Sequence, residues 1–600
     1  MNRPSNSLIT SKVETPSLGA DLLSAGTAGL RTKRHRSPIL VLHGFCLALI
    51  FLTALVQTWA SRYEMNPDGI SYLEVASAYV HHAWGAAING YWNPLYPSLL
   101  APALALKHSA GVRDFVLAHV VNLLIFTLSL LSFRFFFTGL LRMQRTLFPV
   151  SAFSDVPVWV WELLGSALFI SCSLDLITIT LVSADLLVAV IVFAVMGILL
   201  RVIYLPDARC RPMYFVLLGC LLGLGYLTKP VMLFFALIVM AVTLVASRWH
   251  EVSLQLPVLT LLVFSLIAGP YIGLVSMKEH RFTIGENGPL TYLFIVGGLP
   301  YGYAHGVRLP PGSILKHPPR LILSKPAIYE FVGPVPGSCP IWYDTSYWYD
   351  GVKVRFSPIG QMWQLLKNTK MLSNIIFLRQ APLCVALFAL LLLTEDTRNV
   401  LRGVLRQWVL IVPAAALILL NLSINLQGRL IAPHLTVLWA CFLGGIRPRY
   451  DQENPRVLRS LLVAGASLLF IGVIFQIATD AAHAERGIST SSTTHSTNED
   501  RAMAAGLERA GIPGSASVAY VGDSITAYWA HLAGVRIVAE IPVEEKRAFL
   551  DANQDTMKTV LATLSNTGAA AVITPQPPTR ADAGWQPVPG TDYYMHFLHR

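Results

Sequence analysis

Charged side chains are scarce in this sequence. Asp, Glu, Lys and Arg make up only 13% of the 600 residues, whereas 54% are hydrophobic, and the mean hydropathy is +0.54. So few charges cannot cover a water-soluble globule with a polar surface, and 600 residues are too many for one domain. The composition therefore excludes a soluble single-domain protein and predicts a polytopic membrane protein.

Cysteine is also rare, and no internal repeat is visible. Of the seven cysteines, only Cys339 lies in a segment expected outside the membrane, so the sequence predicts no disulfide framework. Many secondary transporters carry an inverted repeat, and its absence counts against that class. The formal net charge is +11, but the basic residues are spread over short loops. This excess indicates membrane topology and not a nucleic-acid surface.

Long apolar runs, by contrast, are abundant. Windows of about 18 to 22 apolar residues, long enough to cross a hydrocarbon core about 30 Å thick, predict about eleven membrane helices. These are expected near 38–60, 114–138, 156–176, 182–203, 212–228, 230–247, 255–277, 374–393, 408–424, 430–446 and 459–479. Basic residues flanking alternate ends predict a cytoplasmic N-terminus and an external C-terminus.

The chain is therefore expected to be an all-α polytopic membrane protein with a small C-terminal α/β module. In the last 100 residues, apolar strands such as "SVAYV" and "VRIVAEI" alternate with helical patterns, which is typical of an α/β unit. The predicted parts are a disordered cytoplasmic tail (1–37), a membrane domain (38–479) with external loops 61–113 and 278–373, a polar linker (480–500) and an extracytoplasmic module (501–600).

The stretch "NPDGISYLEVA" follows the first span and places Asp68 at the outer membrane boundary. Tyr72 and Glu74 follow it in a helical pattern that predicts a helix lying along the interface. An acid in the first turn of such a helix has an ordinary structural explanation, because it complements the helix dipole. Asp68 is therefore either a helix-capping residue or a catalytic base.

Three further charged residues are expected at the same membrane boundary. Asp185 lies at the start of the fourth span, Lys229 between the fifth and sixth, and Arg429 at the start of the tenth. Each has a simpler explanation, such as snorkelling or pairing with a nearby acid. Together they fit another role: Lys and Arg can hold a phosphate, and a carboxylate can take a proton from an attacking hydroxyl.

Several short motifs resemble those of the GT-C-type membrane glycosyltransferases, a class related to protein O-mannosyltransferases and lipid A aminoarabinose transferases. The matching pieces are "NPDGISYLEVA" and "NPLYP" in the first external loop, "SADLL", "LGLGYLTKP" and "GRLIAP". Their order and placement follow the family across most of the membrane domain. The sequence departs from it at Gly69, where a second acid is missing after Asp68, and at Leu430, where an aromatic residue is common.

The resemblance implies transfer of a sugar from a polyprenyl-phosphate-linked donor to an acceptor hydroxyl outside the cytoplasm, with inversion. Asp68 would be the catalytic base, and Asp185, Lys229, Arg429, Glu74 and Tyr72 would bind donor or acceptor. The implied partners are the polyprenyl-phosphate sugar, a lipid, glycan or protein acceptor, and the lipids of a bacterial inner membrane. A divalent metal held by Asp68 and Asp185 is possible, although two carboxylates far apart in sequence are poor evidence for one.

Other functions are also compatible with parts of the sequence. A surface-polysaccharide polymerase or ligase would use the same kind of donor, and a lipid or solute transporter would share the apolar composition. In the module, "YVGDSITAYW" resembles the nucleophile block of an SGNH-type hydrolase, with Ser524 as nucleophile and Asp592 and His596 as partners. The ordinary interpretation of that block is a strand-to-helix turn capped by Asp523 or Ser524.

Overall fold

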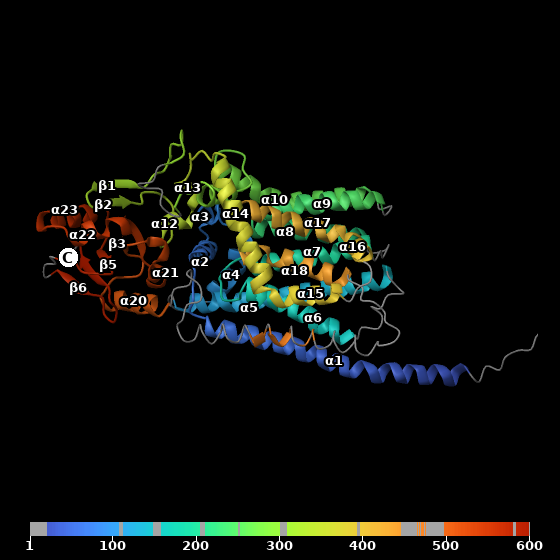
Figure 1. The fold of residues 1–600 in the computed structure, drawn as a ribbon. Helices are drawn as coiled ribbons and strands as arrows, with labels where there is room; N and C mark the ends of the chain where they lie inside the picture. The colour runs from blue at the N-terminus through green and yellow to red at the C-terminus, as the bar shows by residue number, and fades with distance from the viewer. Residues whose placement is uncertain are drawn as a thin grey trace, which may run out of the picture.

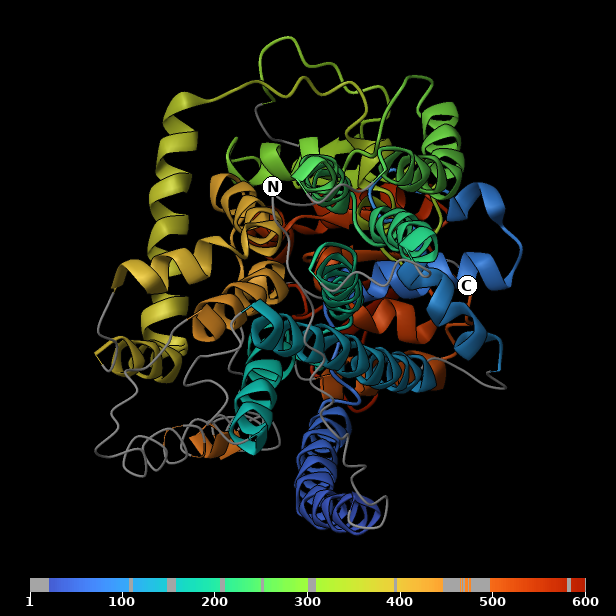
Figure 2. The ribbon, with the colours of Figure 1, turned by 90° about the vertical axis from the view of Figure 1, so that its right-hand side faces the viewer.

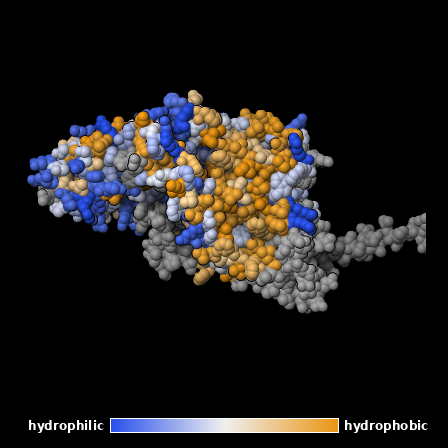
Figure 3. Space-filling model, turned by 45° about the horizontal axis from the view of Figure 1, so that its top comes forward, coloured by the Kyte–Doolittle hydropathy of each residue, from blue (hydrophilic) through white to orange (hydrophobic). Residues whose placement is uncertain are grey.

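The structure is a computed structural model, and it divides into a helical bundle and a sheet-containing unit at one end of the bundle (Figure 1). Apolar side chains form a broad band over the bundle, whereas the surface of the sheet unit is largely hydrophilic (Figure 3). This division agrees with a membrane domain and a module outside it. The described residues are 21–106, 112–147, 158–204, 211–249, 253–300, 309–392, 397–445, 497–579 and 584–598, with single positions between 465 and 475.

Seven helices of the described part of the chain are long and apolar enough to cross a membrane, so the protein is an integral membrane protein. They are α1 (Asp21–Ala60), α5 (Val112–Leu147), α6 (Val158–Ile170) with its π-helical continuation η2 (Ser171–Leu176), α7 (Asp185–Ile203), α8 (Arg211–Thr228), α9 (Met232–Trp249) and α10 (Gln255–Lys278). The first seven predicted spans are each found as one of these helices.

Small residues allow two of these helices to approach closely. A Cβ atom added to Gly219 of α8 would lie 2.7 Å from the carbonyl oxygen of Thr260 in α10. At Gly223, one turn further along, it would lie 2.8 Å from the side chain of Ile267. Glycines four residues apart are a common way to bring helix backbones together in a membrane, where close packing replaces the hydrophobic effect.

The total of about eleven spans is not confirmed. The eighth predicted span is a bent pair, in which α14 (Pro358–Asn374) and its π-helical end η3 (Ile375–Arg379) meet α15 (Ala381–Leu392) at 72°. In Figure 2, α14 (yellow) lies at the edge of the bundle. A hydropathy window registers apolar content and does not register such a bend.

The ninth and tenth predicted spans correspond to helices of the described chain. After α16 (Thr397–Leu405), the ninth predicted span is α17 (Trp408–Ser423), a short apolar helix of 16 residues, and the tenth is α18 (Gly428–Gly445). The eleventh, at 459–479, lies almost entirely outside the described residues. α1 begins at Asp21, inside the range expected to be a disordered tail, and continues through Pro38. Residues 1–20 of that tail and 480–496 of the expected linker lie outside the described residues.

Short helices of the two loops predicted to be external cover the end of the bundle that is next to the module. These are α2 (Pro67–Val80), α3 (Trp84–Ala87) and α4 (Leu95–Ala105) from the first loop, and α11 (Asn287–Ile295), α12 (Pro340–Tyr343) and α13 (Thr345–Trp348) from the second. α2 begins with Pro67, whose missing N–H costs nothing at that position. Nine of its 14 residues are buried, so protein encloses α2. The sequence pattern predicted a helix lying along the membrane interface.

The module contains one seven-stranded mixed sheet in the order β1-β2-β4-β3-β5-β7-β6. The strands are β1 (Arg320–Ser324), β2 (Ala327–Glu330), β3 (Ser517–Val521), β4 (Arg536–Ile541), β5 (Ala571–Thr574), β6 (Trp585–Pro587) and β7 (Tyr594–Phe597). Helices α20 (Thr497–Arg509), α21 (Tyr528–Ala533), α22 (Lys546–Leu550) and α23 (Gln554–Ser565) flank it, with the 3₁₀ turns η4 (Ser524–Thr526) and η5 (Val543–Glu545). β3 and β4 coincide with the predicted strands "SVAYV" and "VRIVAEI".

Two strands of this sheet come from the second external loop. β1 and β2 form an antiparallel hairpin, and Tyr329 of β2 pairs with Glu540 of β4. The module is therefore not built from residues 501–600 alone, because the loop between α10 and α14 completes its sheet. This shared sheet ties the module to the outer end of the bundle.

Candidate active site

A cavity of about 2200 Å³ lies between the outer ends of the membrane helices and the module. A single small-molecule pocket is typically about 300–1,000 Å³, so this cavity has room for more than one substrate. Its wall includes the end of α1, the first turns of α2 and α18, the turn between α8 and α9, and α11. Asn498, Arg501 and Ile525 of the module also line it.

Asp68 and Arg429 meet at the wall of this cavity. The guanidinium of Arg429 donates from Nη2 and Nη1 to Asp68 Oδ2, at 3.3 and 3.4 Å. The two side chains are 26% and 22% exposed, so both remain open to the cavity. Asp68 lies in the first turn of α2, and the Asn66 side chain next to it exchanges hydrogen bonds with the backbone of Val182.

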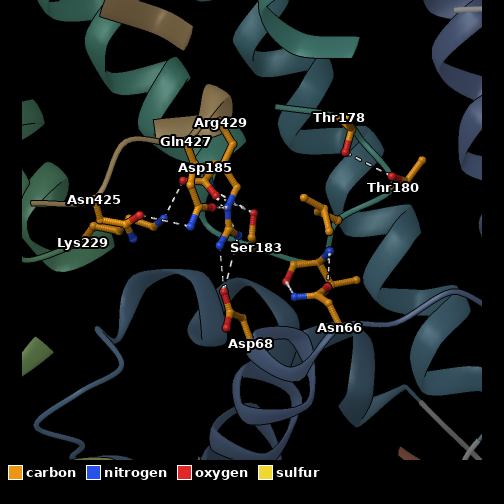
Figure 4. A network of polar contacts seen from close by, with 12 residues as sticks. Asn66, Asp68, Thr178, Thr180, Ser183, Asp185, Lys229, Asn425, Gln427 and Arg429 are labelled. Carbon is orange, nitrogen blue, oxygen red and sulfur yellow. Dashed lines mark hydrogen bonds and ion pairs between the residues drawn. The ribbon is translucent and has the colours of Figure 1, made fainter. Parts of the chain in front are cut away.

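Asp185 is the buried centre of the same network (Figure 4). Its carboxylate accepts from Lys229 Nζ at 2.5 Å, from Arg429 Nη1 at 3.4 Å and from Ser183 Oγ at 2.9 Å. Only 2% of its side chain is exposed. Arg429 Nε donates to Gln427 Oε1 at 2.9 Å, which fixes the plane of the guanidinium.

The structure thus brings together all four charged residues that the sequence placed at one depth. Four separate elements supply them: α2, α7, the α8–α9 turn and α18. Arg429 touches both carboxylates, and Lys229 touches only Asp185. Two positive and two negative side chains balance one another, so an anion entering the cavity would compete with the carboxylates for both bases.

Tyr72 is also part of this wall. Its ring packs edge-on against Trp92 and Tyr96, at centroid distances of 5.0 and 4.9 Å. Burial, followed by the negative charges of Asp68 and Asp185, raises the pKa of Tyr72 well above its usual value. The phenol therefore remains neutral and can donate a hydrogen bond into the cavity.

Glu74 is placed elsewhere and does not line the cavity, so its binding of donor or acceptor stays a prediction. Its carboxylate accepts from the backbone N–H of Ser338 at 2.8 Å and lies 3.4 Å from His531 Nδ1 of the module. The side chain is buried and does not line the cavity. Helical periodicity separates the faces of α2, but it does not reveal which face meets a substrate and which meets the module.

Two ion pairs on other parts of the cavity wall had no clear signal in the sequence. Arg379 Nε donates to Asp175 Oδ1 at 2.8 Å, and Arg281 Nη2 lies 2.8 Å from Glu286 Oε2. Arg379 lies inside the apolar window taken as the eighth span. It is the last residue of η3, directly before the bend to α15, and it lines the cavity.

The carboxylates of the network are poorly suited to a divalent metal. Asp68 and Asp185 both face Arg429, and Asp185 also faces Lys229, so their charges are already compensated. Among the residues that the structure describes, no group of three or more His, Cys, Asp or Glu side chains is placed to hold a metal ion. The reaction proposed for this site uses no metal ion.

The hydrolase-like block of the module is a capped turn. Asp523 accepts from the backbone N–H of Ile525 at 3.0 Å, as an N-terminal cap does. Ser524 is 3% exposed, and the Cys339 thiol donates to its Oγ at 3.5 Å. His596 lies in β7 against Trp585, on the far side of β5 from β3 and the turn that follows it.

The fold of this chain is similar to that of solved structures of other proteins. ArnT from Cupriavidus metallidurans in the apo state aligns with 93% of this chain and 98% of its own, at 12% identity and a TM-score of 0.50. ArnT bound to undecaprenyl phosphate aligns over 94% and 98%, at 12% identity and a TM-score of 0.46.

The oligosaccharyltransferase of Archaeoglobus fulgidus, tethered with an acceptor peptide, aligns over 88% of this chain and 69% of its own. The identity is 11% and the TM-score is 0.45. Neither a protein-family model nor a curated protein matches the sequence. At 12% identity the likeness to ArnT in the apo state shows the fold alone.

Asp185→Asn should destabilise the protein strongly. Removing one partner of a buried ion pair leaves uncompensated charge and costs about 3–5 kcal/mol; because Lys229 and Arg429 stay partly exposed, we expect about 3 kcal/mol. Thermal unfolding of the detergent-solubilised protein measures the effect. Asp592→Asn, the same change at an exposed position of the module, is the matched control, and equal midpoints for the two variants would contradict the prediction.

Proposed function

We propose that this protein transfers a sugar from a polyprenyl-phosphate-linked donor to an acceptor hydroxyl at the extracytoplasmic face of the membrane. The observation that carries the proposal is the shared location of one partly exposed carboxylate and two basic side chains on the wall of a large cavity at the membrane boundary. A lipid-linked phosphate needs positive charge at that depth, and the attack of a hydroxyl needs a base nearby.

In the proposed reaction, Lys229 and Arg429 bind the donor phosphate and Asp68 acts on the acceptor. The acceptor oxygen forms a bond to C1 of the sugar while the bond from C1 to the phosphate oxygen breaks. The polyprenyl phosphate leaves with the electron pair of that bond, and the acceptor proton passes to Asp68. Attack opposite the leaving group inverts the configuration at C1.

The remaining residues of the network have supporting roles in this proposal. Asp185 holds Lys229 and Arg429 at the correct spacing, since its carboxylate touches both. Tyr72 donates a hydrogen bond from its neutral phenol to donor or acceptor. Salt bridges that orient cationic side chains in advance reduce the cost of binding the phosphate.

The proposed orientation places the N-terminus in the cytoplasm and the cavity and module outside a bacterial inner membrane. The basic residues of the short loops support it. The apolar band over the bundle (Figure 3) would contact membrane lipids. The acceptor would be a lipid, a glycan or a protein that enters between the bundle and the module. A growing polysaccharide as acceptor would make the same reaction a polymerase or ligase step.

A donor panel tests the proposal. Purified protein in lipid nanodiscs is incubated with polyprenyl-phosphate sugars, with nucleotide sugars carrying the same sugars, and with lipid, glycan and peptide acceptors. We expect transfer from at least one lipid-linked donor and none from the nucleotide sugars, with inverted configuration in the product. If the protein neither binds nor uses any polyprenyl-phosphate sugar, the proposal is wrong.

A further inference from the structure

A histidine of the module lies between two carboxylates of the bundle. His531, in α21, has Nδ1 at 3.4 Å from Glu74 Oε1 of α2 and Nε2 at 3.6 Å from Asp114 Oδ2, at the beginning of α5. Its ring stacks on Phe115, with 6.1 Å between the centroids and 12° between the planes. The side chain is 11% exposed, and each carboxylate side chain is 9% exposed.

Two carboxylates face the His531 ring. α20 also packs against α21, where its Asp500 accepts from the backbone N–H of Trp529 at 3.0 Å, and burial raises the pKa of Asp500 to about 7. α2 contributes Glu74, α5 contributes Asp114, and the second external loop contributes the uncharged Ser338, which binds Glu74 through its backbone N–H and its hydroxyl. Burial lowers the pKa of the imidazole, but its contacts with Asp114 and Glu74 outweigh burial and raise the pKa to about 9. With that pKa the ring holds its proton at neutral pH, between the carboxyl groups of Glu74 and Asp114.

Glu74 and Asp68 lie on the same short helix. They are six residues apart in α2, which corresponds to about 9 Å along the helix axis. A contact that fixes Glu74 therefore fixes both the rotation of α2 about its axis and its position along that axis. The Asp68 carboxylate, in the first turn of α2, therefore moves whenever the helix rotates or shifts along its axis.

We propose that His531 is a positioning residue: it ties α2 to the module and thereby sets where Asp68 stands in the cavity. The module then has a role in the reaction without contacting substrate through this histidine. The catalytic part of this inference rests on the proposed function, whereas its mechanical part, the fixing of α2, does not. A displacement of about 1 Å at a reacting group can cost about 10²-fold in rate.

Hydrogen–deuterium exchange of the full-length protein tests the mechanical part without any substrate. In His531→Gln we expect faster exchange across α2 and unchanged exchange in β3, which reports whether the module stays folded. His596→Gln is the matched control, because it makes the same change within the module in a strand that pairs with β5 and β6. Unchanged exchange in α2 of His531→Gln overturns the inference.

Kinetics test the catalytic part. We expect His531→Gln to lower kcat for sugar transfer by about 10- to 100-fold with little change in the donor KM, since Lys229 and Arg429 are not on α2. Adding Glu74→Gln to His531→Gln should cost little more, because both changes break one contact. Additive losses, or a loss confined to KM, overturn the positioning role.

A pH profile separates this role from simple packing. The contact of His531 with Glu74 and Asp114, here called the clasp, is charged while the imidazole holds its proton. Because the pKa of His531 is raised, the stability that the charged clasp contributes is fully present below about pH 6.5, the ordinary pKa of histidine, and is lost as the pH rises through about 9. Exchange in α2 of the wild-type protein should therefore quicken above pH 9, after correction for intrinsic exchange, and should not do so in His531→Gln. If wild type transfers no sugar but α2 responds as described, the proposed function fails and the clasp stands.

Discussion

Asp68→Asn should reduce the rate of sugar transfer by about 10²- to 10⁴-fold, the usual contribution of a positioned general base. Asparagine has nearly the same shape and keeps an oxygen that can accept from Arg429, so the fold of α2 and its contact with α18 should survive. The amide cannot take the acceptor proton at any accessible pH. The loss should therefore fall on kcat, with the donor still bound.

The measurement is a single-turnover assay with saturating lipid-linked donor, together with donor binding to the same variant. Asp592→Asn on the exposed surface of the module controls for the loss of one negative charge. Transfer by Asp68→Asn at the wild-type rate would return Asp68 to the role of a helix-capping residue. A loss of donor binding without a change in the single-turnover rate would also contradict its role as base.

The meeting of the four charged residues was predicted more accurately than the number and course of the membrane helices around them. Membrane helices alternate in direction, so the number of spans between two residues decides whether they share a face, and the first seven spans were found correctly. That was enough to place Asp68, Asp185 and Lys229 together. The number of spans before Arg429 was uncertain. Arg429 was nevertheless predicted at this face, because its short motif lies at the start of the predicted tenth span, which is α18.

What the sequence could not give were the contacts that depend on tertiary structure. The β1–β2 hairpin joins a sheet whose neighbouring strand, β4, lies about 200 residues later in the chain, and nothing in either segment specifies that pairing. Arg379 lies within an apolar window, and the window does not register the bend that follows it or its ion pair with Asp175. Glu74 was assigned to the site because it lies on the same helix as Asp68, yet it faces the module.

The arrangement around Arg429 links donor binding to the availability of the base. Its guanidinium donates to Asp68 Oδ2 through two nitrogens, so an oxygen that could accept the proton is already engaged. A donor phosphate that draws Arg429 toward itself would weaken those hydrogen bonds. We therefore expect Asp68 to be free to take the acceptor proton only when the donor is in place, which would limit unproductive chemistry in the empty site.

Arg429→Lys tests this link, and we expect it to lower kcat/KM by about 10- to 150-fold. Lysine keeps the charge but has no planar fork, so it cannot contact the phosphate and hold Asp68 and Asp185 at once; each hydrogen bond to a charged group is worth about 1.5–3 kcal/mol. Steady-state kinetics and inhibition by polyprenyl phosphate should show KM and the inhibition constant rising together while kcat falls. Arg509→Lys, at an exposed position of the module, is the matched control. If kcat falls while KM and the inhibition constant stay at wild-type values, Arg429 orients Asp68 without touching the donor, and Lys229 alone remains as the phosphate ligand.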